Sequence, residues 1–196
     1  MGKSGSTKIS GESAPPEQSS GIAKKFSYNG GVPYFVREYE PADFEALWRI
    51  DQACFIPGIA YSRRELLTYI GRKTAFTLVA QRAEAQERVL HSVDDLGGFI
   101  TADIGRARRG HIITIDVMQA ARRSGVGTLL LRSAEERMRL AGCVEAELET
   151  AIDNVGALSF YKRHEYFLVR TVREYYANGA DAFVLKKDLR LAATGD

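Results

Sequence analysis

The chain has 196 residues, of which 45% are apolar and 27% charged, a balance typical of a globular protein with its own core. The formal net charge is +2, because 25 acidic residues offset 27 basic ones, which argues against a nucleic-acid partner. No apolar run reaches the ~20 residues that span a bilayer, and the N-terminus lacks the apolar segment of a secretory signal. We therefore expect a cytoplasmic protein without a membrane partner.

Composition divides the chain into a long folded part and two tails. Residues 1–25 are rich in Ser, Gly, Lys and Pro and are predicted to be a disordered tail. Residues 33–190 are predicted to form one domain, followed by a short C-terminal tail at 191–196. Cys54 and Cys143 both lie in apolar contexts, so we expect buried thiols in a reducing compartment.

The first half of the domain alternates between strand and helix signals. Phe44, Leu47, Ile50 and Cys54 recur at helical spacing, and Ser62 with Glu65 forms a capping box at the start of a second helix. The predicted elements are a strand at 34–40, a helix at 41–55, a helix from Ser62, a strand at 74–81 and a surface loop at 83–96.

The second half begins with two strands, 97–105 and 111–118, joined by the short basic turn "RARRG". A helix follows and is closed by Gly142. The remaining predicted elements are a strand at 143–150, a helix at 154–163 and a hairpin of 167–176 with 181–189, turning at Asn178-Gly179. The order β-α-α-β-β-β-α-β-α-β-β predicts a mixed sheet with helices packed on it, an α/β (α+β) fold.

The segment "RRSGVG", Arg122 to Gly127, lies where a strand runs into a helix. A helix N-terminus offers unpaired N–H groups and about half a positive charge, and glycine lets an anion approach the backbone. Two arginines add charge at the entrance. The segment therefore predicts a phosphate site, or alternatively a helix cap packed closely on the sheet.

Several motifs together resemble the GNAT superfamily of N-acetyltransferases. "RRSGVG" fits its Gln/Arg-x-x-Gly-x-Gly/Ala pattern, and Asn154, Ala157 and Tyr161 fit its Asn-x-x-Ala-x-x-x-Tyr pattern. The opening "VREYEPADFEALWRIDQACF" and the closing "YYANGADAFVLKKDL" resemble RimI-type members, which acetylate protein N-termini. Arg123 and Glu165 stand where the family frequently has glycine. The resemblance covers about residues 34–189.

This resemblance implies a sheet of about seven strands, mostly antiparallel, flanked by about four helices, with two central strands splayed apart. It also implies acetyl-coenzyme A as the ligand of the phosphate site, with pantetheine hydrogen-bonded to the strand that ends at Val117. The residues implied in cofactor binding are Ile115, Val117, Arg122, Arg123, Ser124, Gly125, Val126, Gly127, Thr128, Asn154 and Ala157.

Acetyl transfer to an amine requires a neutral amine, a donor for the thioester carbonyl and an acid for the departing thiolate. Tyr161 occupies the family's tyrosine position and is the predicted acid, with simple aromatic packing as the alternative. His111 is a candidate base, because period-two alternation puts it on one face with Ile113, Ile115 and Val117. It could equally be a surface histidine at a strand edge. Glu149 is the second candidate base.

The predicted acceptor is a primary amine, in particular a protein or peptide N-terminus, attacked directly in a ternary complex. A small-molecule amine is a second possibility, and a non-catalytic coenzyme A sensor is a third. Tyr61, Tyr175 and Tyr176 line the acceptor groove if the resemblance holds, and pack elsewhere if it does not. No metal is expected, and the chain is expected to be a monomer or a homodimer.

Overall fold

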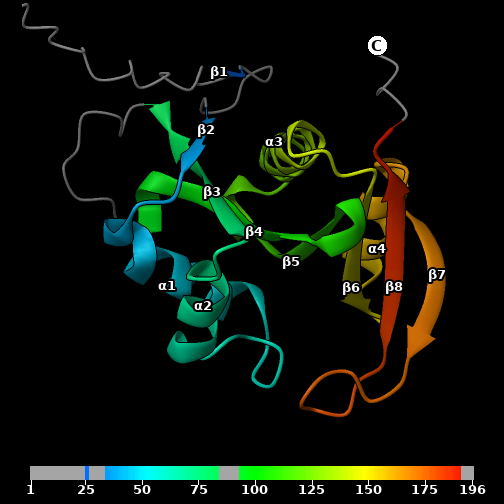
Figure 1. Cartoon of the computed structure of the whole chain (residues 1–196). Coiled ribbons are helices and arrows are strands. Elements are labelled where there is room, and N and C mark those ends of the chain that lie inside the picture. Colours follow the sequence, from blue (N-terminus) through cyan, green and yellow to red (C-terminus); the bar gives the residue numbers. More distant parts are fainter. Residues whose placement is uncertain (1–24, 27–33, 84–92, 191–196) are drawn as a thin grey trace, which may run out of the picture.

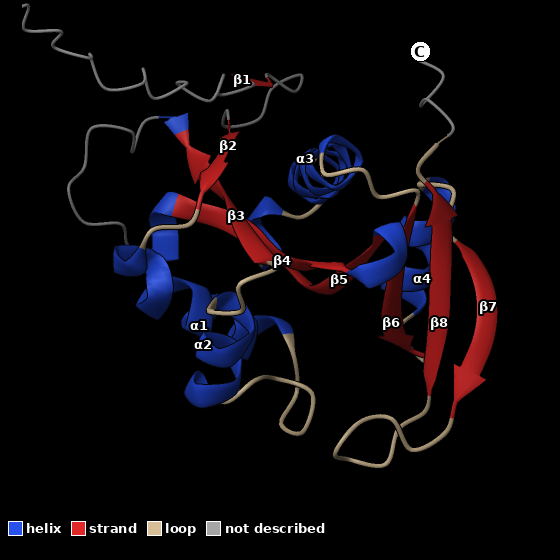
Figure 2. Ribbon diagram, in the orientation of Figure 1, coloured by secondary structure: helices blue, strands red, loops and turns tan. Residues whose placement is uncertain are grey.

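The computed structural model describes residues 25–26, 34–83 and 93–190. The predicted tails therefore lie outside the described residues, except for Lys25. The described residues form an eight-stranded sheet and four α-helices, joined in places by short 3-10 turns (Figures 1 and 2). In chain order the elements are β1 Lys25–Phe26, β2 Tyr34–Glu38, α1 Phe44–Cys54, α2 Arg63–Ile70, β3 Ala75–Arg82, β4 Leu96–Gly105, β5 Arg109–Val117, α3 Val126–Leu140, β6 Glu145–Ala151, α4 Val155–Arg163, β7 Phe167–Val172 and β8 Ala182–Asp188.

The sheet is mixed and mostly antiparallel, as predicted. Its strand order is β1-β2-β3-β4-β5-β6-β8-β7, and β5 with β6 is the parallel pair among the described strands. The short strand β1 was not predicted and adds to the seven expected strands. The last strand, β8, lies between β6 and β7, so β7 forms one edge of the sheet.

The parallel pair opens partway along its length, which confirms the predicted splay. Pairing between β5 and β6 runs from Arg109–Glu145 to Ile112–Leu148 and then stops. Beyond that point β5 continues to Val117 and β6 to Ala151 without a shared ladder. In Figure 1, β4 and β5 run across the view while β6, β8 and β7 run down it. The divergence leaves the β6 side of β5, from residue 113 to 117, without a partner among the described strands.

Two separate cores hold the helices to opposite faces of the sheet. On one face α1 and α2 bury Leu47, Ile50 and Leu66 against Val79 and Phe99. The other face is covered by α3 and α4, whose apolar side chains pack on strands β2 to β6 and on β8. The helical spacing of Phe44, Leu47, Ile50 and Cys54 is confirmed, because all four contact the α1–α2 core.

The helix ends follow the local sequence signals. Ser62 accepts from the Glu65 N–H and the Glu65 carboxylate accepts from the Ser62 N–H, so the predicted capping box is present. Gly142 follows α3 with φ of +83°, and the amides of Gly142 and Cys143 donate to Arg139 and Met138. This is a Schellman motif, and it confirms Gly142 as the stop signal.

Several boundaries differ by a few residues from those predicted, among them those of β4 and β7. Leu96 was assigned to a loop but begins β4, where it is buried in the α1–α2 core. The strand predicted to reach residue 176 ends at Val172, so residues 173–181 form a longer connection to β8. Gly179, with φ of +80°, still marks the turn. Within the described part of the chain, no helix has the length and hydropathy needed to cross a bilayer.

Candidate active site

The N-terminus of α3 carries a row of free backbone donors. Its N-cap residue, Gly125, has no side-chain cap, and the hydroxyl of Ser124 donates instead to the Ala121 carbonyl at 2.6 Å. Among the described residues, no acceptor is found for the amides of residues 123–128. Gly125 has φ of +91° and precedes the first right-handed helical residue, a sequence of conformations that turns successive N–H groups to one side. These donors fit an anionic ligand such as a pyrophosphate.

The two glycines of this segment have different physical reasons. Gly125 adopts a left-handed conformation, which few other residues tolerate. Gly127 lies against α4, and a Cβ there would come within 3.3 Å of the Phe160 ring. Close packing of α3 on α4 therefore explains the glycine at position 127, and the approach of an anion to the backbone is not needed to explain it. Arg122 and Arg123 are exposed beside the row of amides.

The free edge of β5 faces the gap between β5 and β6. The N–H of Met118 donates to Gly97 of β4, so the alternating peptide groups of Ile115 and Val117 point the other way. The Val117 carbonyl accepts from Nε of Arg122 at 3.0 Å and from the Cys54 thiol at 3.4 Å. The Val117 carbonyl is thus occupied, and the groups at this edge that an extended amide-containing chain could pair with are the Ile115 peptide group and the Val117 N–H.

A β-bulge at Ile113 changes which side chains share a face of β5. The register with β4 shifts between Thr101 and Ala102, so Ile113 is an additional residue in β5. Ile112 and Ile115 consequently pack on the same core, although simple alternation would separate them. The prediction that His111 shares a face with Ile115 and Val117 is therefore wrong. The bulge turns His111 toward the opposite face of the sheet.

His111 and Glu149 meet across the beginning of the splay. Nε2 of His111 lies 2.7 Å from Oε2 of Glu149, and the two side chains are 37% and 13% exposed. Because a carboxylate only accepts, the neutral imidazole carries its proton on Nε2 and keeps the Nδ1 lone pair free. The two candidate bases are thus one hydrogen-bonded pair.

The charges around this pair favour its ionised form. Burial opposes a charged imidazole, but Glu149, with smaller effects from Glu147 and Asp103, raises the pKa of His111 above its usual value. Burial likewise opposes a charged Glu149, but His111, Tyr175 and Arg170 lower the pKa of its carboxyl. A proton taken up by His111 is therefore stabilised by its neighbour.

Tyr161 lies deep in the core on the α4 side and is only 5% exposed. Its ring packs edge-on against Phe160 and Tyr166, with centroid distances of 5.3 and 5.4 Å. Burial, with the charges of Asp116 and Tyr176, raises the pKa of Tyr161, so the phenol stays protonated at neutral pH. No contact joins it to the His111–Glu149 pair among the described residues, so the structure keeps the two predicted groups apart.

Three further predicted residues have local structural partners. Asn154 caps α4 by accepting from the Ala157 amide at 3.0 Å, and Ala157 packs partly on the α3–α4 core. The Thr128 hydroxyl lies 3.1 Å from Nε2 of His164. In the basic turn, Arg108 donates to the Gly142 carbonyl at 2.8 Å. That turn is tied to the end of α3 by this bond.

Two loops meet over the open end of the gap. A Cβ on Gly58, between α1 and α2, would lie 3.2 Å from the Cβ of Asn178, between β7 and β8. The Tyr61 hydroxyl donates to the Ile113 carbonyl at 3.4 Å. Burial and the nearby charge of Glu149 raise the pKa of Tyr175. No local sequence pattern predicts that Tyr175 lies near Glu149, because one residue is in the β7–β8 loop and the other is in β6.

Comparisons with known proteins agree with this geometry. The model of the acetyltransferase (GNAT) family matches residues 44–166. An N-alpha-acetyltransferase of Sulfolobus acidocaldarius is 36% identical over 83 residues, which are 42% of this chain and 49% of that protein. The chain thus spans about half the length of the curated relatives that it matches first.

Two solved structures share the fold. The ribosomal-protein-S18-alanine N-acetyltransferase from Escherichia coli superimposes with a TM-score of 0.67 at 16% identity, covering 83% of this chain and 98% of that one. A chain of the NatC complex bound to Gag peptide and coenzyme A gives 0.66 at 21% identity, covering 79% and 98%. Both likenesses concern the fold. With its family match over more than half of its length, the chain belongs to the GNAT acetyltransferase family.

Proposed function

We propose that this protein is an N-acetyltransferase that moves the acetyl group of acetyl-coenzyme A directly to the N-terminal amine of a protein or peptide. The observation that carries the proposal is the His111–Glu149 pair, which lies at the splay of β5 and β6 in a chain of the acetyltransferase family. The pair places a proton acceptor at the point where β5 and β6 separate.

The α3 N-terminus fits the cofactor. The free amides of residues 123–128, with Arg122 and Arg123 beside them, would hold the pyrophosphate. The Ile115 peptide group and the Val117 N–H would hold the pantetheine amides, with Asn154 and Ala157 across the gap. Acetyl-coenzyme A supplies an activated acetyl thioester when bound, and the similar NatC structure contains coenzyme A.

His111 acts as the general base in this proposal. Nδ1 takes a proton from the acceptor's ammonium group, directly or through one water, and so leaves the neutral amine that attacks, while Nε2–H remains bonded to Glu149. The Glu149 carboxylate fixes the tautomer and stabilises the imidazolium that forms. Against the effect of burial, His111 lowers the pKa of the same carboxyl, and so does Tyr175, which lies near it in the β7–β8 loop.

Tyr161 acts as the general acid. Its phenol is protonated at neutral pH, and its ring is held between Phe160 and Tyr166. Donation of the phenol proton to the leaving sulfur would avoid releasing a bare thiolate. Burial raises the pKa of both cysteines, that of Cys54 to about 11, so neither is ionised and a covalent acyl-cysteine step is not needed.

The acceptor would enter between the α1–α2 and β7–β8 loops. Tyr61, Tyr175 and Tyr176 come from these two loops, and their hydroxyls and ring edges suit a polypeptide backbone. The names of the relatives, N-alpha-acetyltransferase and S18-alanine N-acetyltransferase, favour a RimI-like protein N-terminus as acceptor. The two free thiols are in keeping with a reducing, cytoplasmic compartment.

A thiol-release assay tests the proposal. The full chain is mixed with acetyl-coenzyme A and a panel of peptides with free N-termini, alongside polyamines. Release of coenzyme A that depends on a peptide supports the proposal. Release only with polyamines would show that the acceptor is a small-molecule amine and not a protein N-terminus. Tight acetyl-coenzyme A binding with no release for any acceptor would instead identify a sensor.

A further inference from the structure

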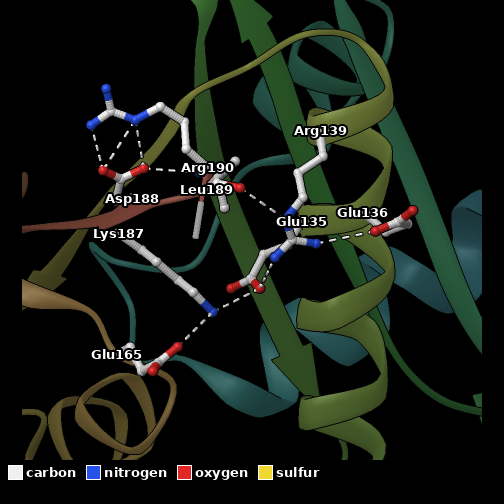
Figure 3. Close-up of polar contacts among 8 residues, drawn as sticks. All are labelled: Glu135, Glu136, Arg139, Glu165, Lys187, Asp188, Leu189 and Arg190. Carbon is white, nitrogen blue, oxygen red and sulfur yellow. Dashed lines mark hydrogen bonds and ion pairs between the residues drawn. The ribbon is translucent and has the colours of Figure 1, made fainter. Parts of the chain in front are cut away.

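A cluster of charged side chains lies buried between α3 and the end of β8 (Figure 3). Nζ of Lys187 donates to Oε2 of Glu135 at 2.9 Å, and Arg139 donates to the same oxygen at 3.3 Å. Lys187 is 7% exposed and Glu135 2%. Glu165 approaches Lys187 from the solvent side, with Oε2 3.8 Å from Nζ. Two ionised groups are thus held away from water inside the α3–α4 core.

Stability alone gives little reason for this cluster. Removing two charges from water costs about as much as their attraction returns, so apolar residues of similar size often serve a core equally well. Glu165 adds to the cost, because its φ of +66° is a left-handed conformation that glycine adopts more easily. Non-glycine residues in such conformations gather at functional sites. The cluster therefore calls for a reason beyond folding.

The cluster lies directly behind the aromatic residues that hold Tyr161. Nζ of Lys187 is 5.8 Å from the centroid of the Tyr166 ring, a cation–π distance. The Tyr166 ring in turn packs edge-on against the Tyr161 ring, with a centroid distance of 5.4 Å, and the backbone N–H of Tyr166 donates to the Tyr161 carbonyl at 3.0 Å. The Tyr166 hydroxyl is buried without a hydrogen-bond partner among the described residues. Contacts to its ring therefore fix its place.

We propose that Lys187, held in place by Glu135, is a positioning residue for Tyr161 and acts on it through the ring of Tyr166. The inference rests on the proposed function, in which Tyr161 donates the proton to the leaving sulfur. Glu135 and Arg139 come from α3, whose N-terminus is the proposed phosphate site. One helix therefore presents the cofactor phosphates and also supports the ring behind the acid.

The first test is a double-mutant cycle in the full chain. Lys187→Met keeps the length of the side chain and removes its charge, and about a tenfold lower kcat with KM unchanged within twofold is expected, because a displaced acid transfers its proton poorly. Lys187→Arg should restore most of the rate. In the Tyr161→Phe background, Lys187→Met should lower kcat no further, because the hydroxyl that it positions is gone.

A matched control comes from another buried ion pair. Arg37 and Asp43 lie near the opposite end of the sheet, with side chains 16% and 0% exposed. Arg37→Met should lower stability comparably while kcat stays at the parental value. The inference would be overturned if the effects of Lys187→Met and Tyr161→Phe on kcat were fully additive. It would also be overturned if Arg37→Met lowered kcat as much as Lys187→Met does. Either result would leave the cluster with a structural role alone.

A second readout does not require turnover. In protein labelled with carbon-13 at the tyrosine ζ-carbon, the Tyr161 signal is assigned by its loss in Tyr161→Phe. Lys187→Met should move or split this signal in the free protein, and Arg37→Met should leave it in place. An unmoved signal in folded Lys187→Met would overturn the inference. If Lys187→Met does not fold, Glu135→Gln replaces it with the same expected outcomes.

The two proposals fail in different ways. Parental kcat in Tyr161→Phe would remove the acid from the proposed function, whatever the NMR signal does. A large kcat loss in Tyr161→Phe combined with parental kcat and an unmoved signal in Lys187→Met would leave the acid in place and refute the positioning role.

Discussion

At the scale of single residues, the proposed base His111 and its partner Glu149 would determine the pH at which the site can accept a proton. Glu149 raises the pKa of His111, and a general base must be neutral to act. The rate at low substrate should therefore rise with pH as the solution passes through a His111 pKa above about 6.5. Loss of the neighbouring carboxylate charge should reverse this shift, because burial alone lowers the pKa of a histidine.

The first prediction follows from this electrostatic pairing. Glu149→Gln should move the acidic limb of the kcat/KM profile to lower pH and reduce its plateau by on the order of tenfold or more, because the imidazolium loses its stabilising charge. The measurement is kcat/KM against pH for the parent and the variant. An acidic limb at the same pH in both proteins would mean that His111 is not the titrating base.

Tyr161 gives the second prediction. Tyr161→Phe removes one hydroxyl and leaves the ring between Phe160 and Tyr166, so the fold and the acetyl-coenzyme A affinity should persist. We expect kcat to fall by ~100-fold, about 2.7 kcal/mol, with little change in KM. The measurement is steady-state kinetics under conditions where the chemical step is shown to limit turnover. A kcat within about twofold of the parent would mean that Tyr161 has only a packing role.

Glu165 gives a prediction about stability alone. Its left-handed backbone costs about 1–2 kcal/mol, whereas glycine loses about 0.5–1 kcal/mol more conformational entropy on folding. Glu165→Gly should therefore raise stability by about 0.5–1 kcal/mol. Thermal and urea unfolding measure the change. A lower melting temperature would show that the carboxylate near Lys187 contributes more than the backbone strain costs.

At the scale of elements, the N-terminus of α3 is the part of the site that depends most on local backbone geometry. Gly125→Val places a branched side chain at φ of +91° beside the free amides. We expect acetyl-coenzyme A affinity to fall at least tenfold, about 1.4 kcal/mol, by calorimetry. Gly142→Val is the matched control, because Gly142 has φ of +83° at the other end of the same helix. Equal affinities in the two folded variants would remove this segment from the site.

The elements also separate what the sequence could predict from what it could not. The α2 capping box, the Gly142 stop and the Asn178-Gly179 turn depend on neighbours along the chain, so local patterns predicted them. The bulge at Ile113 depends on the register of β5 with β4, and no residue type in β5 predicts it. For that reason alternation placed His111 on the wrong face, although the residue itself was correctly chosen as a candidate.

At the scale of the whole molecule, the splay of β5 and β6 brings the parts of the site together. The pairing of His111 with Glu149, and of the α1–α2 loop with the β7–β8 loop, joins positions far apart in the sequence. Such contacts follow from the strand order, which a single sequence does not encode locally. The family resemblance correctly predicted the splay, the four helices and the mixed sheet.

The central claim is that the site transfers acetyl to an N-terminal amine. The most direct test is mass spectrometry of a peptide that carries both a free α-amine and an internal lysine, after incubation with the full chain and acetyl-coenzyme A. We predict one added acetyl group, located on the α-amine, and no acetylation of the same peptide with a blocked N-terminus. Acetyl found only on the lysine, or no acetylated product while acetyl-coenzyme A binds, would contradict the claim.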